Sequence, residues 1–143
     1  MVKNMETKPY ERQVNYYETD QMGIAHHSNY LRYFEEARMD FMRQLRLSTQ
    51  ELENMGIIIP NVDAYAKYLR LLRFEERFLV VVKPALFTGV RMKFEYEVLR
   101  GGELCSTGYT THCFVDKEMK PLILRHKYPE LHDRFAEIFN QKS

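Results

Sequence analysis

Long apolar runs are absent from this sequence of 143 residues. None approaches the ~20 residues that a membrane-spanning helix requires, and residues 1–9 lack the apolar core of a secretion signal. We therefore expect a cytoplasmic protein with no membrane span. A strong charge of one sign is absent as well, because the net charge is only +1. Such a chain has no basic field to attract nucleic acid as its main partner.

Cysteine is scarce, with Cys105 and Cys113 as its two instances. If both lie on one extended strand, eight residues separate them by about 26 Å at ~3.3 Å per residue. A disulfide requires Cα atoms within about 7 Å, so we expect two free thiols. Internal repeats, low-complexity tracts and dividing linkers are also missing. Residues 1–143 are therefore predicted to form a single domain.

Several motifs that carry catalysis or ligand binding are missing. The sequence contains neither a G-x-S-x-G nucleophile elbow nor a glycine-rich phosphate loop. A metal site built from Asp20, His26, His27 and His112 lacks any recognised ligand spacing. We expect no metal and no consumed cofactor.

The strongest pattern present is an amphipathic helix of roughly four turns that follows Ser28. Its apolar stripe recurs at intervals of three and four residues and consists of Tyr30, Phe34, Ala37, Phe41 and Leu45. Ser28 or Asn29 is placed to cap its first amides. The large aromatic side chains indicate that this helix packs against something broad, such as the concave face of a sheet.

Strand patterns surround this helix. One strand is predicted over residues 10–16, and a short helix follows between the capping box at Ser48 and a left-handed residue at Gly56. Further strand patterns, separated by a stop near Pro84 and a hairpin turn at Gly101, cover residues 57–72, 77–82, 90–98 and 104–115. Pro129 opens a terminal helix. Four strands after one long helix predict an antiparallel α+β fold.

Asp20 is the leading candidate for chemistry, since it lies shortly before the helix start. The free amides and partial positive charge there can stabilise an oxyanion, and a carboxylate can attack a carbonyl or activate water. The main-chain amide of His27 is the candidate donor. The adjacent His26 and His27 side chains are expected to diverge. Arg32 and Glu36 have the spacing of an ion pair on the helix surface.

Residues 14–30, VNYYETDQMGIAHHSNY, closely resemble the signature of hotdog-fold acyl-CoA thioesterases. The nearest group is the 4-hydroxybenzoyl-CoA thioesterase family, which includes the acyl-CoA thioesterases associated with the Tol–Pal system. The resemblance implies a five-stranded antiparallel sheet wrapped around a long central helix. It implies pairing into a homodimer or homotetramer, with active sites at the dimer interface.

The same resemblance implies roles for individual residues. Asp20 corresponds to the catalytic aspartate, and His27 to the position whose backbone amide polarises the thioester carbonyl. Gly23, Ser28 and Tyr30 correspond to substrate-binding positions. The implied reaction is hydrolysis of an acyl-CoA to a free acid and coenzyme A, with Asp20 as general base or nucleophile.

Three alternatives stay open at the level of sequence. A hotdog-fold hydratase or dehydratase pairs its aspartate with a histidine five residues later, where this chain has Ala25. A non-catalytic acyl-thioester binding protein would bind without turnover. An acyl carrier protein could replace coenzyme A as the thiol donor. The residues that bind the coenzyme A phosphates are unknown, and the nearest basic candidates are Arg70, Arg73, Lys83, Arg91 and Lys93.

Overall fold

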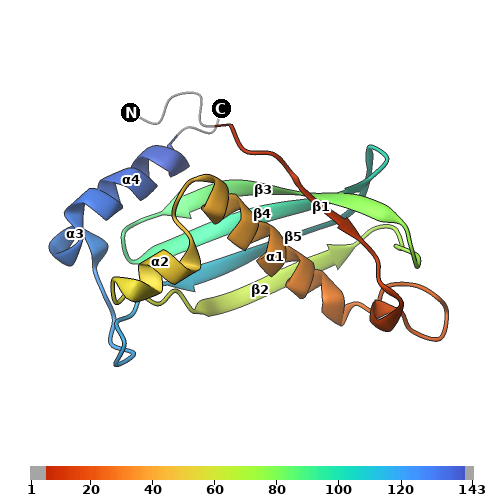
Figure 1. The fold of residues 1–143 in the computed structure, drawn as a ribbon, viewed down its shortest axis with the longest axis horizontal. Coiled ribbons are helices and arrows are strands. Elements are labelled where there is room, and N and C mark those ends of the chain that lie inside the picture. Colours follow the sequence, from red (N-terminus) through yellow and green to blue (C-terminus); the bar gives the residue numbers. More distant parts are fainter. Residues whose placement is uncertain (1–5, 141–143) are drawn as a thin grey trace.

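Five strands form one antiparallel sheet in the computed structural model, which describes residues 6–140 (Figure 1). The spatial order of the strands is β1-β3-β4-β5-β2. Their bounds are Tyr10–Gln13 (β1), Asn61–Tyr68 (β2), Arg77–Phe87 (β3), Arg91–Arg100 (β4) and Glu103–Cys113 (β5). The expected α+β architecture is confirmed, and β2 and β1 lie at the two edges of the sheet.

Strand β4 has the clean alternation that the sequence predicted. Its inward side chains are all buried and comprise Met92, Phe94, Tyr96 and Val98. Charged residues between them face the other side of the sheet. Gly101 and Gly102, with φ of 57° and 83°, make the tight turn into β5, because a two-residue hairpin of this kind requires positive φ.

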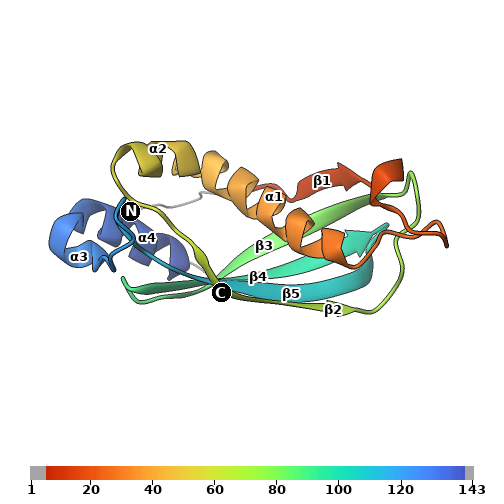
Figure 2. The same ribbon diagram turned by 90° about the horizontal axis from the view of Figure 1, so that it is seen from below.

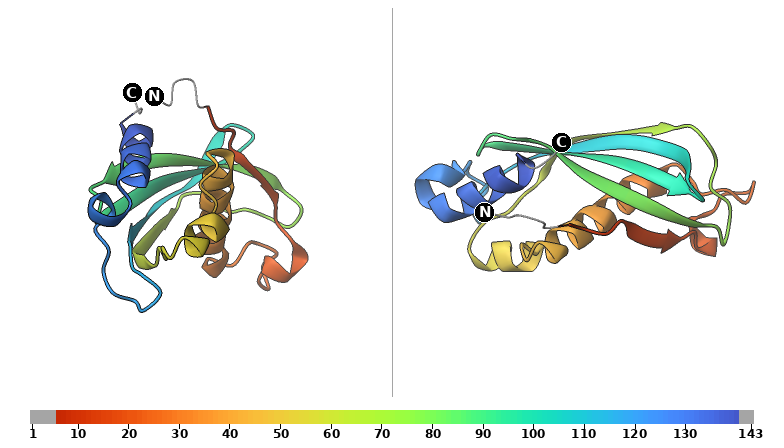
Figure 3. Two further views of the ribbon diagram at one scale, coloured as in Figure 1. Left: turned by 60° about the vertical axis from the view of Figure 1, so that its left-hand side comes forward. Right: turned by 90° about the horizontal axis from the view of Figure 1, so that it is seen from above.

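All the helices within residues 6–140 lie on one face of the sheet, as Figure 2 shows, and Figure 3 shows the opposite face without them. They are α1 (Ser28–Gln44), α2 (Thr49–Asn54), α3 (Leu124–Lys127) and α4 (Pro129–Phe139). The predicted stripe of α1 is buried along its whole length. No helix in the described part of the chain is both long and apolar enough to cross a membrane.

The centre of α1 is fixed by a close approach to the sheet. The ring of Phe34 stacks on Tyr96 with centroids 4.5 Å apart and planes at 4°. A Cβ added to Gly108 would lie 2.4 Å from the Phe34 ring and 2.3 Å from the Tyr65 carbonyl oxygen. Only glycine leaves room for the helix at this point of β5.

Strand β3 corrects one prediction, because it continues past Pro84 to Phe87. Strand β1 pairs with β3 only from Arg77 to Val80. Pro84 therefore lies where β3 has no strand on that side, and its missing amide hydrogen removes no ladder bond there. A shift of register between Pro84 and Leu86 absorbs the irregularity.

Other boundaries also differ from the predictions. Strand β1 ends at Gln13, and a 3-10 turn, η1 (Tyr16–Glu18), replaces the rest of the predicted strand. In the predicted strand 57–72, only β2 is continuous, and Ile58 makes a single bridge to Val115. Helix α3 was not predicted. The capping box of α2, by contrast, is present as expected, with Ser48 accepting the Glu51 amide.

Candidate functional site

Residues 18–26 form a small closed hairpin immediately before α1. The amide of Asp20 donates to the carbonyl of Ile24 over 2.9 Å. At the base of the hairpin, the amide of His26 donates to the carbonyl of Glu18 over 2.8 Å. Asp20 thus lies at the tip of a loop whose two ends are held together next to the first turn of the helix.

The turn at the tip fixes one oxygen of the Asp20 carboxylate. Its Oδ1 accepts the Met22 amide over 2.8 Å, while the Gly23 amide donates to the Asp20 carbonyl over 3.0 Å. Gly23 has φ of +76°, although no atom lies within 4 Å of a Cβ built there. The turn therefore needs glycine for its left-handed backbone and not for space.

The returning leg of the hairpin is attached to the connection between β2 and β3. The Ala25 amide donates to the Leu72 carbonyl over 2.8 Å, and the Phe74 amide donates to the Gly23 carbonyl over 3.2 Å. These bonds tie the Asp20 loop to that connection.

The start of α1 leaves one amide free. The Ser28 amide donates to Nδ1 of His26 over 3.2 Å. The Asn29 and Tyr30 amides donate to the carbonyls of His26 and His27 over 2.9 and 3.2 Å. The His27 amide has no acceptor among residues 6–140. An unpaired amide at a helix start carries part of the positive charge of the helix dipole.

An open groove of about 620 Å³ runs beside Asp20. Its walls consist of Tyr16, Tyr17, Thr19, Asp20, Gln21, Gly23 and Phe74. The rings of Tyr16 and Tyr17 are 77% and 80% exposed, and Tyr16 meets Phe74 edge-on at 5.6 Å. The groove thus offers a half-buried carboxylate beside apolar ring surface.

The chain matches a known protein family over most of its length. The model of the thioesterase-like superfamily matches residues 14–139, which include the hairpin, α1 and every strand of the sheet except β1. The chain belongs to the thioesterase-like superfamily. As a member with this sheet and central helix, it is a hotdog-fold thioester hydrolase.

Individual relatives cover most of the chain. YneP of Bacillus subtilis, which carries the name of an acyl-CoA thioesterase, is 32% identical over 89% of this chain and 94% of its own length. The DHNA-CoA thioesterase of Staphylococcus aureus is 30% identical in sequence. Its structure matches with a TM-score of 0.86 over 91% of this chain and 89% of that one. A structure of the protein AQ1494 from Aquifex aeolicus matches with a TM-score of 0.81 at 32% identity, over 87% of this chain and 98% of that one.

The two histidines at the entrance to α1 of this thioesterase correct two predictions. Their rings do not diverge, because the His26 and His27 centroids lie 4.2 Å apart at an angle of 33°. The helix cap is also not Ser28 or Asn29, since α1 begins at Ser28 itself. Nδ1 of His26 accepts the Ser28 amide in place of the predicted cap.

The predicted substrate-binding positions lie in different surroundings. Gly23 lines the groove, and Ser28 is exposed at the first position of α1, where its Oγ is 2.9 Å from Nδ1 of His26. The Tyr30 side chain is only 3% exposed and packs edge-on against Tyr68 at 4.9 Å. Burial raises the pKa of the Tyr30 phenol to about 12, so this hydroxyl stays protonated.

His112 lies apart from the other members of the candidate metal set. It is fully buried in β5 and pairs with Met92. Tyr68, which approaches His27, pairs instead with Ser106, six residues earlier on the same strand. No three histidine, cysteine, aspartate or glutamate side chains in the described ranges could hold a metal ion together.

The basic candidates for coenzyme A phosphates are dispersed. Arg70 pairs with Glu103 at 3.3 Å, and Lys83 pairs with Glu97 at 3.1 Å on β3 and β4. Arg73 is the candidate nearest to Asp20 along the backbone, because it forms a bridge with Ile24 of the hairpin.

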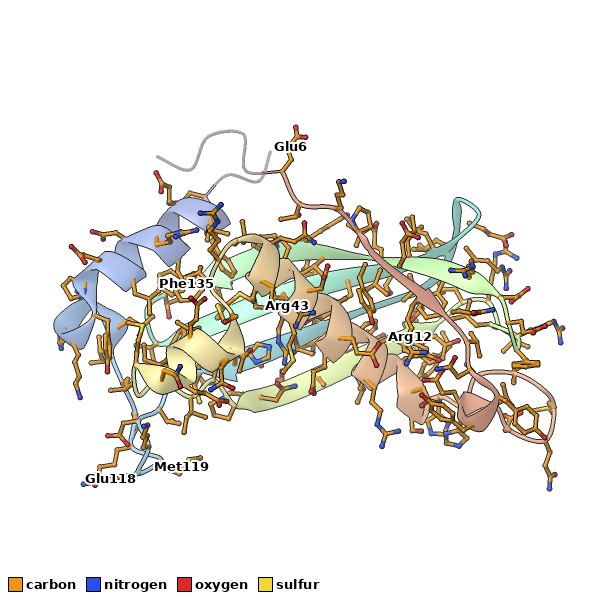
Figure 4. The ribbon with its side chains drawn as sticks, in the orientation of Figure 1. Glu6, Arg12, Arg43, Glu118, Met119 and Phe135 are labelled. Carbon is orange, nitrogen blue, oxygen red and sulfur yellow. The ribbon has the colours of Figure 1, made fainter. Side chains whose placement is uncertain are left out.

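The sequence did not reveal a partly buried ionic cluster next to the hairpin. Arg12 of β1, which is labelled in Figure 4, binds both Glu18 and Glu36, so Glu36 pairs with β1 and not with Arg32 as predicted. One signal could have revealed it. Arg12 falls on the inward side of the first strand with Tyr10, and a charged side chain on a buried face needs a counter-charge.

Proposed function

We propose that this protein hydrolyses acyl-CoA thioesters at the groove beside Asp20, with the His27 amide stabilising the oxyanion. The observation that carries this proposal is the closed hairpin. It holds the Asp20 carboxylate on a short loop whose last residue, His26, directly precedes the free amide of His27 at the helix start, in a chain of the thioesterase-like superfamily. Thioesters have a good leaving group, so a single carboxylate with preorganised amides can suffice.

The proposed reaction needs one proton transfer or one covalent intermediate. As a general base, Asp20 takes a proton from water, whose oxygen attacks the thioester carbon. As a nucleophile, Asp20 attacks that carbon itself and forms an anhydride, which water then hydrolyses. In both cases negative charge develops on the carbonyl oxygen, where the His27 amide would donate. In the general-base route the C–S bond then breaks, and the departing thiolate takes the proton that Asp20 removed from water. In the nucleophilic route the C–S bond breaks as the anhydride forms, and the thiolate takes its proton from solvent water.

The relatives support coenzyme A as the thiol carrier. One carries the name of an acyl-CoA thioesterase and another is a DHNA-CoA thioesterase. An acyl carrier protein is the alternative donor of the acyl group. Hydration is disfavoured, because position 25 holds a buried alanine with no group that could transfer a proton.

We also propose that the working unit is a homodimer or homotetramer joined through β2. This strand lies at an edge of the sheet, and seven of its eight residues are exposed. Its exposed apolar side chains include Val62, Tyr65 and Tyr68. An exposed edge of this kind is a template for pairing with a second copy.

The deciding experiment measures free thiol released from a panel of acyl-CoA esters by the wild type and by Asp20→Asn. Asparagine can still accept the Met22 amide, so the turn should survive. We expect kcat to fall by roughly 10²- to 10⁴-fold, the usual contribution of general acid–base catalysis. Acyl carrier protein thioesters with the same acyl groups, tested in parallel, identify the carrier.

Asp116→Asn is the matched control. Its Oδ1 accepts the Glu118 amide over 2.8 Å, two residues on, which is the same turn contact that Asp20 makes. We expect this variant to keep the full rate. A substantial rate in Asp20→Asn would refute the role given to Asp20. Binding of every ester without turnover in the wild type would favour the non-catalytic reading.

A further inference from the structure

The main chain of Glu18 joins the hairpin to the helix. Its carbonyl accepts two hydrogen bonds, from the His26 amide over 2.8 Å and from Nδ2 of Asn29 over 2.8 Å. Nδ2 of Asn29 also lies 3.2 Å from the His26 carbonyl. One carbonyl therefore closes the base of the Asp20 loop and at the same time holds the first turn of α1 against it.

The side chain of Glu18 fixes that carbonyl in place. The carboxylate is only 4% exposed and receives Nη1 and Nη2 of Arg12 over 2.9 and 2.6 Å. The Asn15 amide and the Tyr33 hydroxyl complete its shell over 2.9 and 3.0 Å. Burial opposes ionisation, but these hydrogen bonds outweigh it and lower the pKa of Glu18 below its ordinary value.

Arg12 connects this carboxylate to the outside of the helix. Its Nε donates to Glu36 of α1 over 2.9 Å, and its guanidinium lies 4.9 Å above the Tyr33 ring. The same cation thus crosslinks β1, η1 and α1. Glu36 binds Arg12 and Tyr10, and within residues 6–140 no hydrogen bond joins its side chain to the hairpin. The two carboxylates on one arginine can therefore be separated experimentally.

A buried ion pair is a weak source of net stability, because desolvation offsets most of the attraction. Here the ion pair instead fixes the position of the loop that carries Asp20. We propose that Glu18 is a positioning residue, which holds the Asp20 carboxylate and the His27 amide in the relative orientation that a thioester carbonyl requires. This inference rests on the proposed function. Glu18 itself touches no substrate and acts through the loop that its carbonyl closes.

The test compares Glu18→Gln with Glu36→Gln in steady-state thioesterase kinetics on the best acyl-CoA. Both variants remove one carboxylate from Arg12, so both should lower the melting temperature. Only Glu18→Gln disturbs the hairpin, and we expect its kcat to fall roughly 10- to 100-fold, as small misplacements of catalytic groups do. KM should stay within about threefold of the wild type if binding contacts are unchanged. Glu36→Gln should keep the wild-type kcat.

A second variant protects the test against misfolding. Tyr33→Phe removes a single hydrogen bond to Glu18 and keeps the ring in the core. We expect it to fold, as circular dichroism would show, and to lower kcat by about threefold to tenfold, since each hydrogen bond to a charged group contributes modestly.

Double variants separate positioning from general destabilisation. If Glu18 acts through Asp20, adding Glu18→Gln to Asp20→Asn should cost less than about threefold further, because coupled groups lose activity non-additively. Equal kcat for Glu18→Gln and Glu36→Gln, or a full additional loss in the double variant, would overturn the positioning role alone. Retention of the rate by Asp20→Asn would overturn the proposed function, and this inference with it.

Discussion

His112 lies in β5 with its ring fully buried beneath α1. Its Nε2 is 2.8 Å from Oγ1 of Thr110, which in turn is 2.6 Å from the Tyr96 hydroxyl. Phe94 packs edge-on against the imidazole at 5.9 Å. Burial, followed by the nearby charge of Arg38, lowers the pKa of His112 from 6.5 to about 3. The folded protein therefore keeps this histidine neutral, whereas the unfolded chain protonates it in mild acid.

This difference makes the free energy of unfolding depend on pH. Between pH 6.5 and about 3 the unfolded chain binds a proton at His112 that the folded protein does not, so acid favours unfolding there. We expect wild type to lose about 2 kcal/mol more stability than His112→Gln between about pH 7 and about pH 5. Urea denaturation at the two pH values measures this loss. Equal losses in the two proteins would contradict it.

At the scale of elements, the contact between α1 and β5 depends on the missing side chain of Gly108. Alanine there would meet the Phe34 ring and the Tyr65 carbonyl at less than 3 Å. We expect Gly108→Ala to destabilise the protein by about 1–3 kcal/mol, the usual cost of overpacking a core. Chemical denaturation measures it. Thr107→Ala, at the neighbouring position of the same strand, is the control and should change stability little.

The sequence predicted those elements whose cause is local. The stripe of α1, the capping box of α2 and the alternation of β4 each follow from spacing within one segment, and all three are confirmed. The predictions were wrong where the pairing of a segment with another element determines its structure. Pro84 is tolerated inside β3 because β1 is too short to reach it. The length of one strand cannot be read from the residues of another.

The candidate site also has features that the sequence predicted and features that it did not. The positions of Asp20 in a glycine turn and of His27 next to the helix start follow from the sequence, while their catalytic roles remain predictions. The cluster of Arg12, Glu18 and Glu36 joins residues up to 24 positions apart. Helical spacing instead favoured Arg32 as the partner of Glu36. Pairing across elements overrode the local rule, because the half-buried guanidinium of Arg12 requires a counter-charge.

For the whole molecule, the exposed edge at β2 leads to a prediction about assembly. We expect sedimentation or light scattering to give two or four times the mass of one chain. If the site is completed by the partner, the specific activity should fall when the protein is diluted below its dissociation constant. A fully active monomer would contradict the proposed interface.

The hydrogen bonds around Glu18 also fix the length of the loop that carries Asp20. The Glu18 carbonyl accepts the amide of His26. This hydrogen bond, and not the turn at the tip, therefore sets the number of residues between Asp20 and the start of α1. One residue inserted between Thr19 and Ala25 would either break the hydrogen bond between His26 and Glu18 or enlarge the turn at the tip. The backbone hydrogen bonds thus fix the seven-residue spacing from Asp20 to His27, and other residues along the groove can vary without changing that spacing.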